Sequence, residues 1–177
     1  MLLEFVVGCN LEQFKRYYKT LGDLHSYYKT LGLQDVNVGE LGVVEEGIVR
    51  DPSHLIVWRE NNEIIGHAIW HASNTDEHRI GDPRDKEDKE ILKGLLGGKK
   101  DFVELHEIWL TKKHRGRGYG KRFFEFFEDF IKKQGYDSIV YYTHNPAAIA
   151  ICRKRGYKED FLAKENWYVF YLSLSQS

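Results

Sequence analysis

The sequence contains little cysteine or proline and has no long apolar run. Its two cysteines, Cys9 and Cys152, lie far apart and outside any CxxC pair, so neither a zinc knuckle nor a disulfide framework is expected. Three prolines and sixteen glycines are too few for a collagen-like chain, and 14% aromatic residues argue against global disorder. No apolar run approaches the roughly 20 residues of a membrane helix, and the first residues lack the features of a signal peptide. We therefore expect a cytoplasmic protein with no membrane partner.

The charge balance gives no global argument for a nucleic-acid partner. The 26 basic and 27 acidic residues leave a formal charge of −1, so any basic patch must be local. The length of 177 residues favours one domain that buries its own core. We expect a single domain over residues 1–177, with an N-terminal strand and helices over 1–50 and a charged insertion over 74–101.

A repeat and a hairpin organise the first half of the chain. The sequence YYKTLG occurs twice, at Tyr17–Gly22 and Tyr27–Gly32, which is too short for a solenoid and predicts helical turns within Leu11–Leu31. Further along, two β-rich runs flank Asn61-Asn62 and predict a hairpin over His54–Ala72.

Two histidines of the second run, His67 and His71, are expected on one strand face because strand side chains alternate. No third ligand is spaced to suggest a metal, so a structural or substrate-lining role is preferred. The four tryptophans are expected to pack in the core and on the sheet. They are Trp58, Trp70, Trp109 and Trp167.

The insertion Asn74–Asp101 carries eight acidic and seven basic residues. Its middle, Arg84–Leu96, predicts a surface helix that ends at Gly97-Gly98. We expect a solvated and partly mobile segment, with a lid over a substrate site as the alternative.

Strands and helices alternate in the second half. A strand over Asp101–Leu110 leads into a basic loop and an amphipathic helix that begins near Tyr119 and stops at Gly135. Another strand, a short helix capped by Asn145 and a closing strand follow. This order predicts a mixed sheet with helices on its faces.

The glycine-rich segment RGRGYG, Arg115–Gly120, lies between the predicted strand and helix. Glycine lets backbone N–H groups approach a ligand closely, and the first N–H groups of a helix favour an anion. A phosphate or pyrophosphate is therefore the expected ligand, with a plain surface turn and an RNA-binding patch as alternatives. The segment matches neither the Walker A element nor GxGxxG. Six basic residues lie in or beside it: Lys112, Lys113, Arg115, Arg117, Lys121 and Arg122.

These residues resemble the GCN5-related N-acetyltransferase (GNAT) superfamily. The loop fits that family's Arg/Gln-x-x-Gly-x-Gly/Ala signature through Arg115, Gly118 and Gly120, and VELHEIWL is similar to its fourth strand. NPAAIAICRKRGY is similar to the second family signature. The matching residues there are Asn145, Ala148, Gly156 and Tyr157. The resemblance is clear over Glu104–Tyr157 and implies an α/β (α+β) fold. Such a fold has a mostly antiparallel sheet of six to seven strands, splayed between strands 4 and 5, with helices on both faces.

The resemblance implies acetyl-coenzyme A as cosubstrate. Its pyrophosphate is expected on backbone N–H groups of Gly116–Lys121, and its pantetheine arm is expected to pair with the strand backbone. Asn145 is expected to contact the arm, cap a helix, or do both. The full expected set is Ile108, Trp109, Leu110, Arg115, Gly116, Arg117, Gly118, Tyr119, Gly120, Lys121, Asn145 and Cys152.

An amine with a pKa near ~10.4 must lose a proton before it attacks a thioester. We predict His106 as the general base, because it lies nine residues before Arg115, where several relatives carry a Glu or His. Glu104 shares its strand face and could orient His106, bind a cationic amine or act as the base itself, whereas Glu107 points away and is a poorer candidate. The backbone N–H of Leu110 is the expected oxyanion donor. The alternative is that His106 is an ordinary strand histidine.

The general acid departs from the family pattern, because Cys152 stands where relatives commonly carry a tyrosine. The thiol could protonate the leaving coenzyme or only pack the helix against the sheet. Tyr141, Tyr142 or Tyr157 could take its place, or solvent could suffice.

The sequence thus predicts an acetyl-CoA-dependent N-acetyltransferase acting on a primary amine of a small molecule or protein. The alternative is a GNAT-fold protein that binds acyl-CoA without catalysis. The acceptor, the acyl chain length and the oligomeric state, a homodimer included, stay open. No bound metal is expected.

Overall fold

The computed structural model describes residues 2–8, 10–24, 26 and 52–174. Cys9 and the second YYKTLG copy therefore lie outside the described residues. Contacts within the chain define two compact units. Unit 1 draws on Met1–Ile69 and Glu107–Arg117, and unit 2 on Trp70–His106 and Gly118–Ser177. None of the described helices combines the length and apolar character needed to cross a bilayer.

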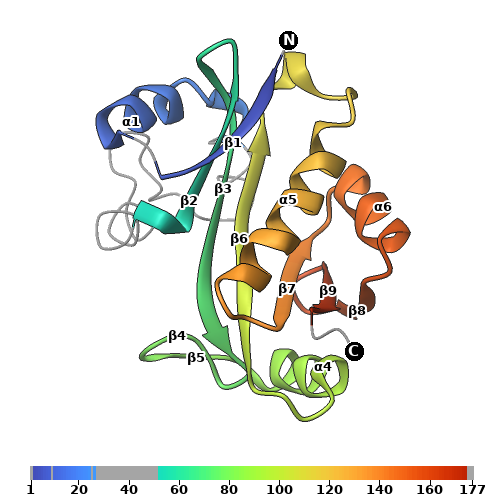
Figure 1. The fold of residues 1–177 in the computed structure, drawn as a ribbon. Helices are drawn as coiled ribbons and strands as arrows, with labels where there is room; N and C mark the ends of the chain where they lie inside the picture. Colours follow the sequence, from blue (N-terminus) through green and yellow to red (C-terminus); the bar gives the residue numbers. More distant parts are fainter. Residues whose placement is uncertain (1, 9, 25, 27–51, 175–177) are drawn as a thin grey trace. The chain divides into compact units, whose positions relative to one another are not determined.

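The predicted mixed sheet is confirmed, with seven strands in the order β1-β2-β3-β6-β7-β9-β8 (Figure 1). All pairings for which a register is given are antiparallel except β6 with β7, which is parallel. The strands are β1 Leu3–Val7, β2 Leu55–Glu60, β3 Glu63–Asn74, β6 Asp101–Leu110, β7 Ser138–Thr143, β8 Lys158–Leu162 and β9 Trp167–Ser173. A separate two-stranded sheet pairs β4 Glu77–Arg79 with β5 Asp82–Pro83.

Helix α1, Leu11–Lys19, packs its apolar face onto strands of unit 1. Its N-cap is Asn10, whose side-chain oxygen accepts a hydrogen bond from the Gln13 N–H at 3.0 Å. The buried cluster that it forms with β2 and β3 contains Phe14, Tyr18, Leu21, Leu24, Leu55, Val57 and Ile69. The predicted β2–β3 hairpin is confirmed, and both turn residues, Asn61 and Asn62, adopt the positive φ that a tight hairpin turn requires. A 3₁₀ turn, Pro52–His54, precedes β2.

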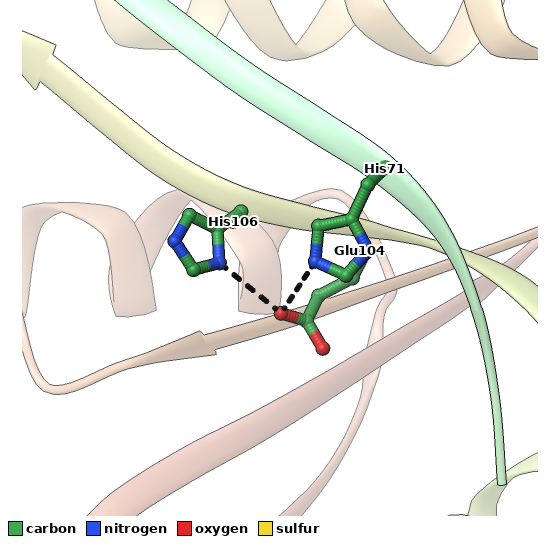
Figure 2. A group of neighbouring side chains, drawn as sticks. All are labelled: His71, Glu104 and His106. Carbon is green, nitrogen blue, oxygen red and sulfur yellow. Dashed lines mark ion pairs between the residues drawn. The ribbon is translucent and has the colours of Figure 1, made fainter. Parts of the chain in front are cut away.

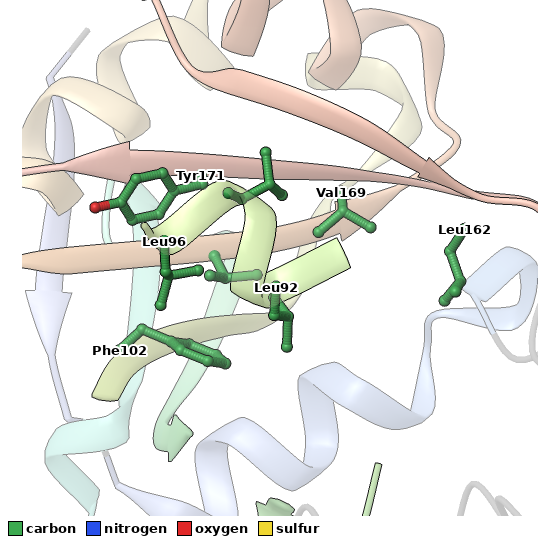
Figure 3. Close-up of a cluster of buried hydrophobic side chains, with 8 residues drawn as sticks. Leu92, Leu96, Phe102, Leu162, Val169 and Tyr171 are labelled. Carbon is green, nitrogen blue, oxygen red and sulfur yellow. The ribbon is translucent and has the colours of Figure 1, made fainter. Parts of the chain in front are cut away.

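The predicted helix in the charged segment is α4, Lys86–Leu96, with Asp85 as N-cap and Gly97 ending it in the left-handed conformation. The expectation that this segment is solvated holds for exposed stretches such as residues 80–83 but is wrong for one face of the helix. Leu92, Leu95 and Leu96 recur at helical spacing and are buried, because one face of α4 completes a core of unit 2 (Figure 3). The other buried members are Phe102, Val140, Leu162, Val169 and Tyr171.

Helices cover both faces of the sheet within unit 2, as predicted. Val140 packs in the α4 core, whereas its neighbour Tyr141 contacts Phe124 of α5, Tyr119–Lys133. Adjacent residues of a strand point to opposite faces, so α4 and α5 lie on opposite sides of β7. The parallel β6–β7 pairing joins Val103–Leu105 with Ile139–Tyr141. These are the fourth and fifth strands of the main sheet, and a pairing this short agrees with the predicted separation of the two strands beyond it.

Helix α6, Pro146–Lys154, packs closely against α5. A Cβ atom at Gly120 would lie 3.0 Å from Cδ1 of Ile151, so glycine sets the approach of the two helices. Asn145 caps α6 as predicted, since its side-chain oxygen accepts from the N–H groups of Ala147 and Ala148.

Candidate active site

The predicted base and its partner lie together on β6. His106 Nδ1 is 3.5 Å from Glu104 Oε2, and a second imidazole, that of His71 on β3, places Nε2 3.3 Å from the same oxygen. Figure 2 shows both ion pairs meeting at one carboxylate oxygen. Glu104 is buried, whereas the His106 side chain is 34% exposed. The imidazole is thus open to an incoming molecule while its partner is fixed.

The other carboxylate oxygen of Glu104 faces a second set of polar groups. Arg84 Nη2 lies 3.3 Å and His78 Nδ1 3.5 Å from Oε1. Arg84 also donates to Asp88 Oδ2 at 2.9 Å, and the hydroxyl of Tyr142 donates to Asp88 Oδ1 at 2.6 Å. Both oxygens of the buried carboxylate are therefore engaged, so its position is fixed.

This environment decides the ionisation of Glu104. Burial by itself raises the pKa of a carboxyl group, but hydrogen bonds from His106, His71 and His78 outweigh it and hold the pKa of Glu104 well below its usual range. A carboxylate that stays ionised is a poor proton acceptor near neutral pH. Of the three roles open to Glu104, the geometry favours orienting His106.

His71 was predicted only as a structural or substrate-lining residue. Its Nδ1 lies 2.9 Å from the carbonyl oxygen of Ala72, which can only accept, so Nδ1 carries a proton and Nε2 faces Glu104. Strand alternation predicts the face on which His71 lies but not which carboxylate of β6 it meets, because that depends on the register of pairing between strands.

The glycine-rich loop has the backbone geometry that an anion site needs. Gly116 and Gly118 both have φ near 79°, and a Cβ atom at either would meet no atom within 4 Å. Gly118 is the N-cap of α5 and offers no side-chain cap, and the first helical turn contains no acidic residue. The surrounding basic side chains of Lys112, Lys113, Arg117, Lys121 and Arg122 are exposed. The residues present thus fit a pyrophosphate.

The guanidinium of Arg115 is engaged within unit 1. Its Nε donates to the Leu110 carbonyl at 2.9 Å, its centre lies 4.7 Å from the Trp109 ring centroid, and Nη2 is 3.5 Å from Asp23 Oδ2. Arg115 therefore fixes the end of β6 where the predicted arm-binding residues Ile108, Trp109 and Leu110 lie. Of the tryptophans, Trp58 and Trp70 are buried as predicted, whereas Trp109 is half-buried beneath this guanidinium.

Cys152 is fully buried in α6, and burial raises the pKa of its thiol to about 12. Such a thiol is a weak acid, which favours the packing alternative. The tyrosines considered as alternative proton donors each contact other residues. Tyr157 donates to Glu128 at 2.9 Å, Tyr142 donates to Asp88, and Tyr141 is buried against Phe124.

Unit 1 contains a buried polar network that the sequence did not predict. His67 Nε2 lies 2.5 Å from Glu107 Oε2, and its Nδ1 is 2.9 Å from the hydroxyl of Tyr17. The hydroxyl of Tyr18 lies 3.4 Å from the other Glu107 oxygen. Burial lowers the pKa of His67 to about 3 and raises the pKa of Glu107 to about 8. His67 and Glu107 meet because β3 lies beside β6, and α1 adds the two tyrosines.

This network predicts a pH dependence of stability. In the folded chain, His67 and Glu107 together bind one proton from about pH 3 to about pH 8. In the unfolded chain the two side chains bind two protons below pH 4.5, one between pH 4.5 and 6.5, and none above pH 6.5. Stability from the pair therefore rises with pH up to 4.5, is level to 6.5 and falls toward 8. We expect the alkaline fall to lower Tm by about 5–10 °C and to be absent in Glu107→Gln. Thermal unfolding at a series of pH values tests this, and a Glu107→Gln profile parallel to wild type above pH 6.5 would contradict it. Glu63→Gln, on the exposed hairpin, is the matched control.

The chain was compared with proteins of known sequence and structure. A search against curated protein sequences found no match. Among solved structures, arylalkylamine N-acetyltransferase 2 from Aedes aegypti superposes with a TM-score of 0.67 at 12% identity, over 99% of this chain and all of that one. Salmonella typhimurium yncA, solved with acetyl-CoA, gives 0.62 at 14% over 100% and 96%. An agmatine N-acetyltransferase gives 0.61 at 11% over 97% and 99%. At these identities the likeness shows the fold alone.

The mixed sheet with helices on both faces is thus the α/β fold that these solved acetyltransferases share. The chain belongs to the acetyltransferase (GNAT) family, whose model matches residues 16–157. The predicted family is thereby confirmed, and with it acetyl-CoA as the cosubstrate. The family match begins at residue 16, before the His54–Ala72 hairpin, and so includes the part of the chain where the sequence resemblance was weak.

Proposed function

We propose that this protein is an N-acetyltransferase that moves the acetyl group of acetyl-CoA to a primary amine. The observation that carries the proposal is the partly exposed His106 imidazole held beside the buried, ionised Glu104 on β6. A histidine can take a proton near neutral pH, and here it has a fixed orientation and an open side.

In direct acetyl transfer, each residue of the site has a separate role. His106 accepts the proton of the attacking amine, and Glu104 orients the imidazole and stabilises its charged form. As the C–N bond forms, the thioester C–S bond breaks, and the backbone N–H of Leu110 is the proposed donor to the oxyanion. The thiolate takes its proton from solvent, since Cys152 and Tyr157 are buried and committed.

The proposed contacts with the coenzyme lie at the glycine-rich loop, at the end of β6 and at the start of α6. Backbone N–H groups at the start of α5, reached through Gly116 and Gly118, would hold the pyrophosphate, with the exposed Lys121 adding positive charge. Ile108–Leu110 would pair with the pantetheine arm. Asn145 uses its side-chain oxygen to cap α6, which leaves its amide nitrogen as the group to contact the arm.

A thiol-release screen tests the proposed function. Purified protein and acetyl-CoA are mixed with arylalkylamines, agmatine, amino acids and peptides with free amines, and acetylated product is confirmed by mass spectrometry. The first two amine classes are chosen because structural neighbours are named for them. Amine-dependent coenzyme release supports the proposal, and its absence across the panel counts against it.

The alternative of a protein that binds acyl-CoA without catalysis has one observation in its favour. Cys152 replaces the tyrosine common in relatives and is buried with a raised pKa, so a proton donor is missing at that position. Tight coenzyme binding measured by calorimetry, together with no transfer in the screen, would favour this alternative.

The start of α5 yields a prediction about coenzyme affinity. Lys121→Glu puts a negative charge in the first turn, where the pyrophosphate would lie, so KM for acetyl-CoA is expected to rise about tenfold with little change in kcat. Lys132→Glu makes the same charge change in the last turn of the same helix and should leave KM near the wild-type value. Equal KM values for the two variants would place the pyrophosphate elsewhere.

A further inference from the structure

We propose that His71, Glu104 and His106 form a binding site for a divalent transition-metal ion of the zinc type. The three residues each offer a ligand atom, and these atoms all lie within 4.8 Å of one another (Figure 2). All three belong to unit 2, on β3 and β6. Two imidazole nitrogens and one carboxylate oxygen are a ligand set that zinc accepts, with a fourth position left for water.

Two of the three distances between the proposed ligand atoms agree with a bound zinc ion. Zinc binds nitrogen and oxygen at about 2.0–2.2 Å, so neighbouring ligand atoms of a tetrahedral site lie about 3.3–3.5 Å apart. Glu104 Oε2 is 3.3 Å from His71 Nε2 and 3.5 Å from His106 Nδ1. The two imidazole ligand atoms lie within 4.8 Å of each other, and a rotation of the His106 ring, whose side chain is 34% exposed, would bring them to the tetrahedral spacing.

The hydrogen bond of His71 provides an independent argument. Its Nδ1–H donates to the Ala72 carbonyl at 2.9 Å, which directs Nε2 toward Glu104. Nε2 of His71 and Oε2 of Glu104 therefore face each other at 3.3 Å, and an ion bound between them would take both atoms as ligands. Metal-binding histidines commonly donate their second N–H to a carbonyl in this manner.

The electrostatics also favour a cation at this oxygen. Arg84 and His78 face Oε1 of Glu104, so Oε2, which faces only the two imidazoles of the proposed ligand set among the contacts described, is the oxygen that would bind an ion. Among the groups around it, Glu104 and Asp88 are acidic and Arg84 basic, which leaves a net negative charge when the histidines are neutral. Imidazole ligands select zinc-like ions over magnesium and calcium, which prefer all-oxygen sites.

An ion bound here would take His106 and Glu104 Oε2 as ligands, so its positive charge would disfavour protonation of the imidazole and Glu104 could no longer stabilise the charged form. Metal binding and amine acetylation are therefore mutually exclusive, so the ion acts as a reversible inhibitor. This consequence rests on the proposed function, whereas the metal site itself does not.

Isothermal titration of the full chain with ZnCl₂ tests the site, with Co²⁺ absorption as a report of coordination geometry. We expect one Zn²⁺ per chain, no binding of Mg²⁺, and affinity lower by roughly tenfold or more in His71→Ala and in His106→Gln. His144→Gln removes a histidine outside the cluster, stacked on Trp167, and should bind as wild type does. The absence of Zn²⁺ binding, or binding unchanged in both cluster variants, would overturn the site. Circular dichroism verifies folding, and His106→Gln changes a partly exposed side chain that the fold tolerates.

Activity separates the two proposals. Zn²⁺ should inhibit the wild type, a chelator should restore the rate, and the rate of His71→Ala should be insensitive to Zn²⁺ whatever its basal value. If His106→Ala acetylates amines at the wild-type rate, the proposed base fails while the titration still decides the metal site.

Discussion

Replacing His106 by alanine is expected to lower kcat/KM for the amine by about 10²- to 10⁴-fold, the usual contribution of a positioned general base. The loss should lie mainly in kcat, because the imidazole takes the amine proton as the C–N bond forms. KM for acetyl-CoA should change little, since the proposed coenzyme contacts lie at Ile108–Leu110 and at the start of α5. Steady-state kinetics on the best amine of the screen provides the measurement.

The pH dependence of the same variant makes the test specific. In the wild type, the rate should fall on the acid side as the base becomes protonated, and this limb should be absent in His106→Ala. Added imidazole should restore part of the rate if the cavity left by the side chain admits it. His144→Ala serves as the control for removal of a histidine elsewhere in unit 2. Kinetics and a pH profile equal to wild type would remove His106 from the mechanism.

Replacing Arg84 by methionine is expected to cost about 3–5 kcal/mol of stability. The side chain is fully buried and bonds to Asp88 and Glu104, at 2.9 and 3.3 Å, and its guanidinium lies 5.3 Å from the Phe102 ring centroid. Methionine keeps most of the volume but leaves two buried carboxylates without their cation. Urea unfolding followed by circular dichroism measures the loss.

A surface arginine provides the matched control for this variant. Arg153 donates to both oxygens of Glu159, at 2.8 and 3.0 Å, but it is exposed to solvent. Water replaces such a pair at little cost, so Arg153→Met should change stability far less. Combining Arg84→Met with Asp88→Asn should recover part of the loss, because one uncompensated charge is removed. Equal effects of the two arginine variants would show that the buried network does not stabilise the fold.

Local patterns in the sequence determined most elements of this fold. The Asn61-Asn62 turn, the cap at Asn145 and the helix stop at Gly97 each depend on residues close in the chain, and all three occur as predicted. The glycine-rich loop likewise predicted an anion site, because backbone conformation and charge at a helix start are local properties, and together with the signature at Asn145–Tyr157 it carried the resemblance to the family.

Contacts between distant segments required the tertiary structure. The high charge of residues 74–101 predicts a solvated segment. In the folded chain, however, Arg84 and Asp88 are buried because they pair with groups on β6 and β7. His71 meets Glu104, and His67 meets Glu107, only because strand register brings β3 beside β6. The sequence by itself determined the elements and the family. Which ionisable side chains share a site, and so how each of them titrates, was decided by packing, because burial and charge pairing are properties of the folded chain.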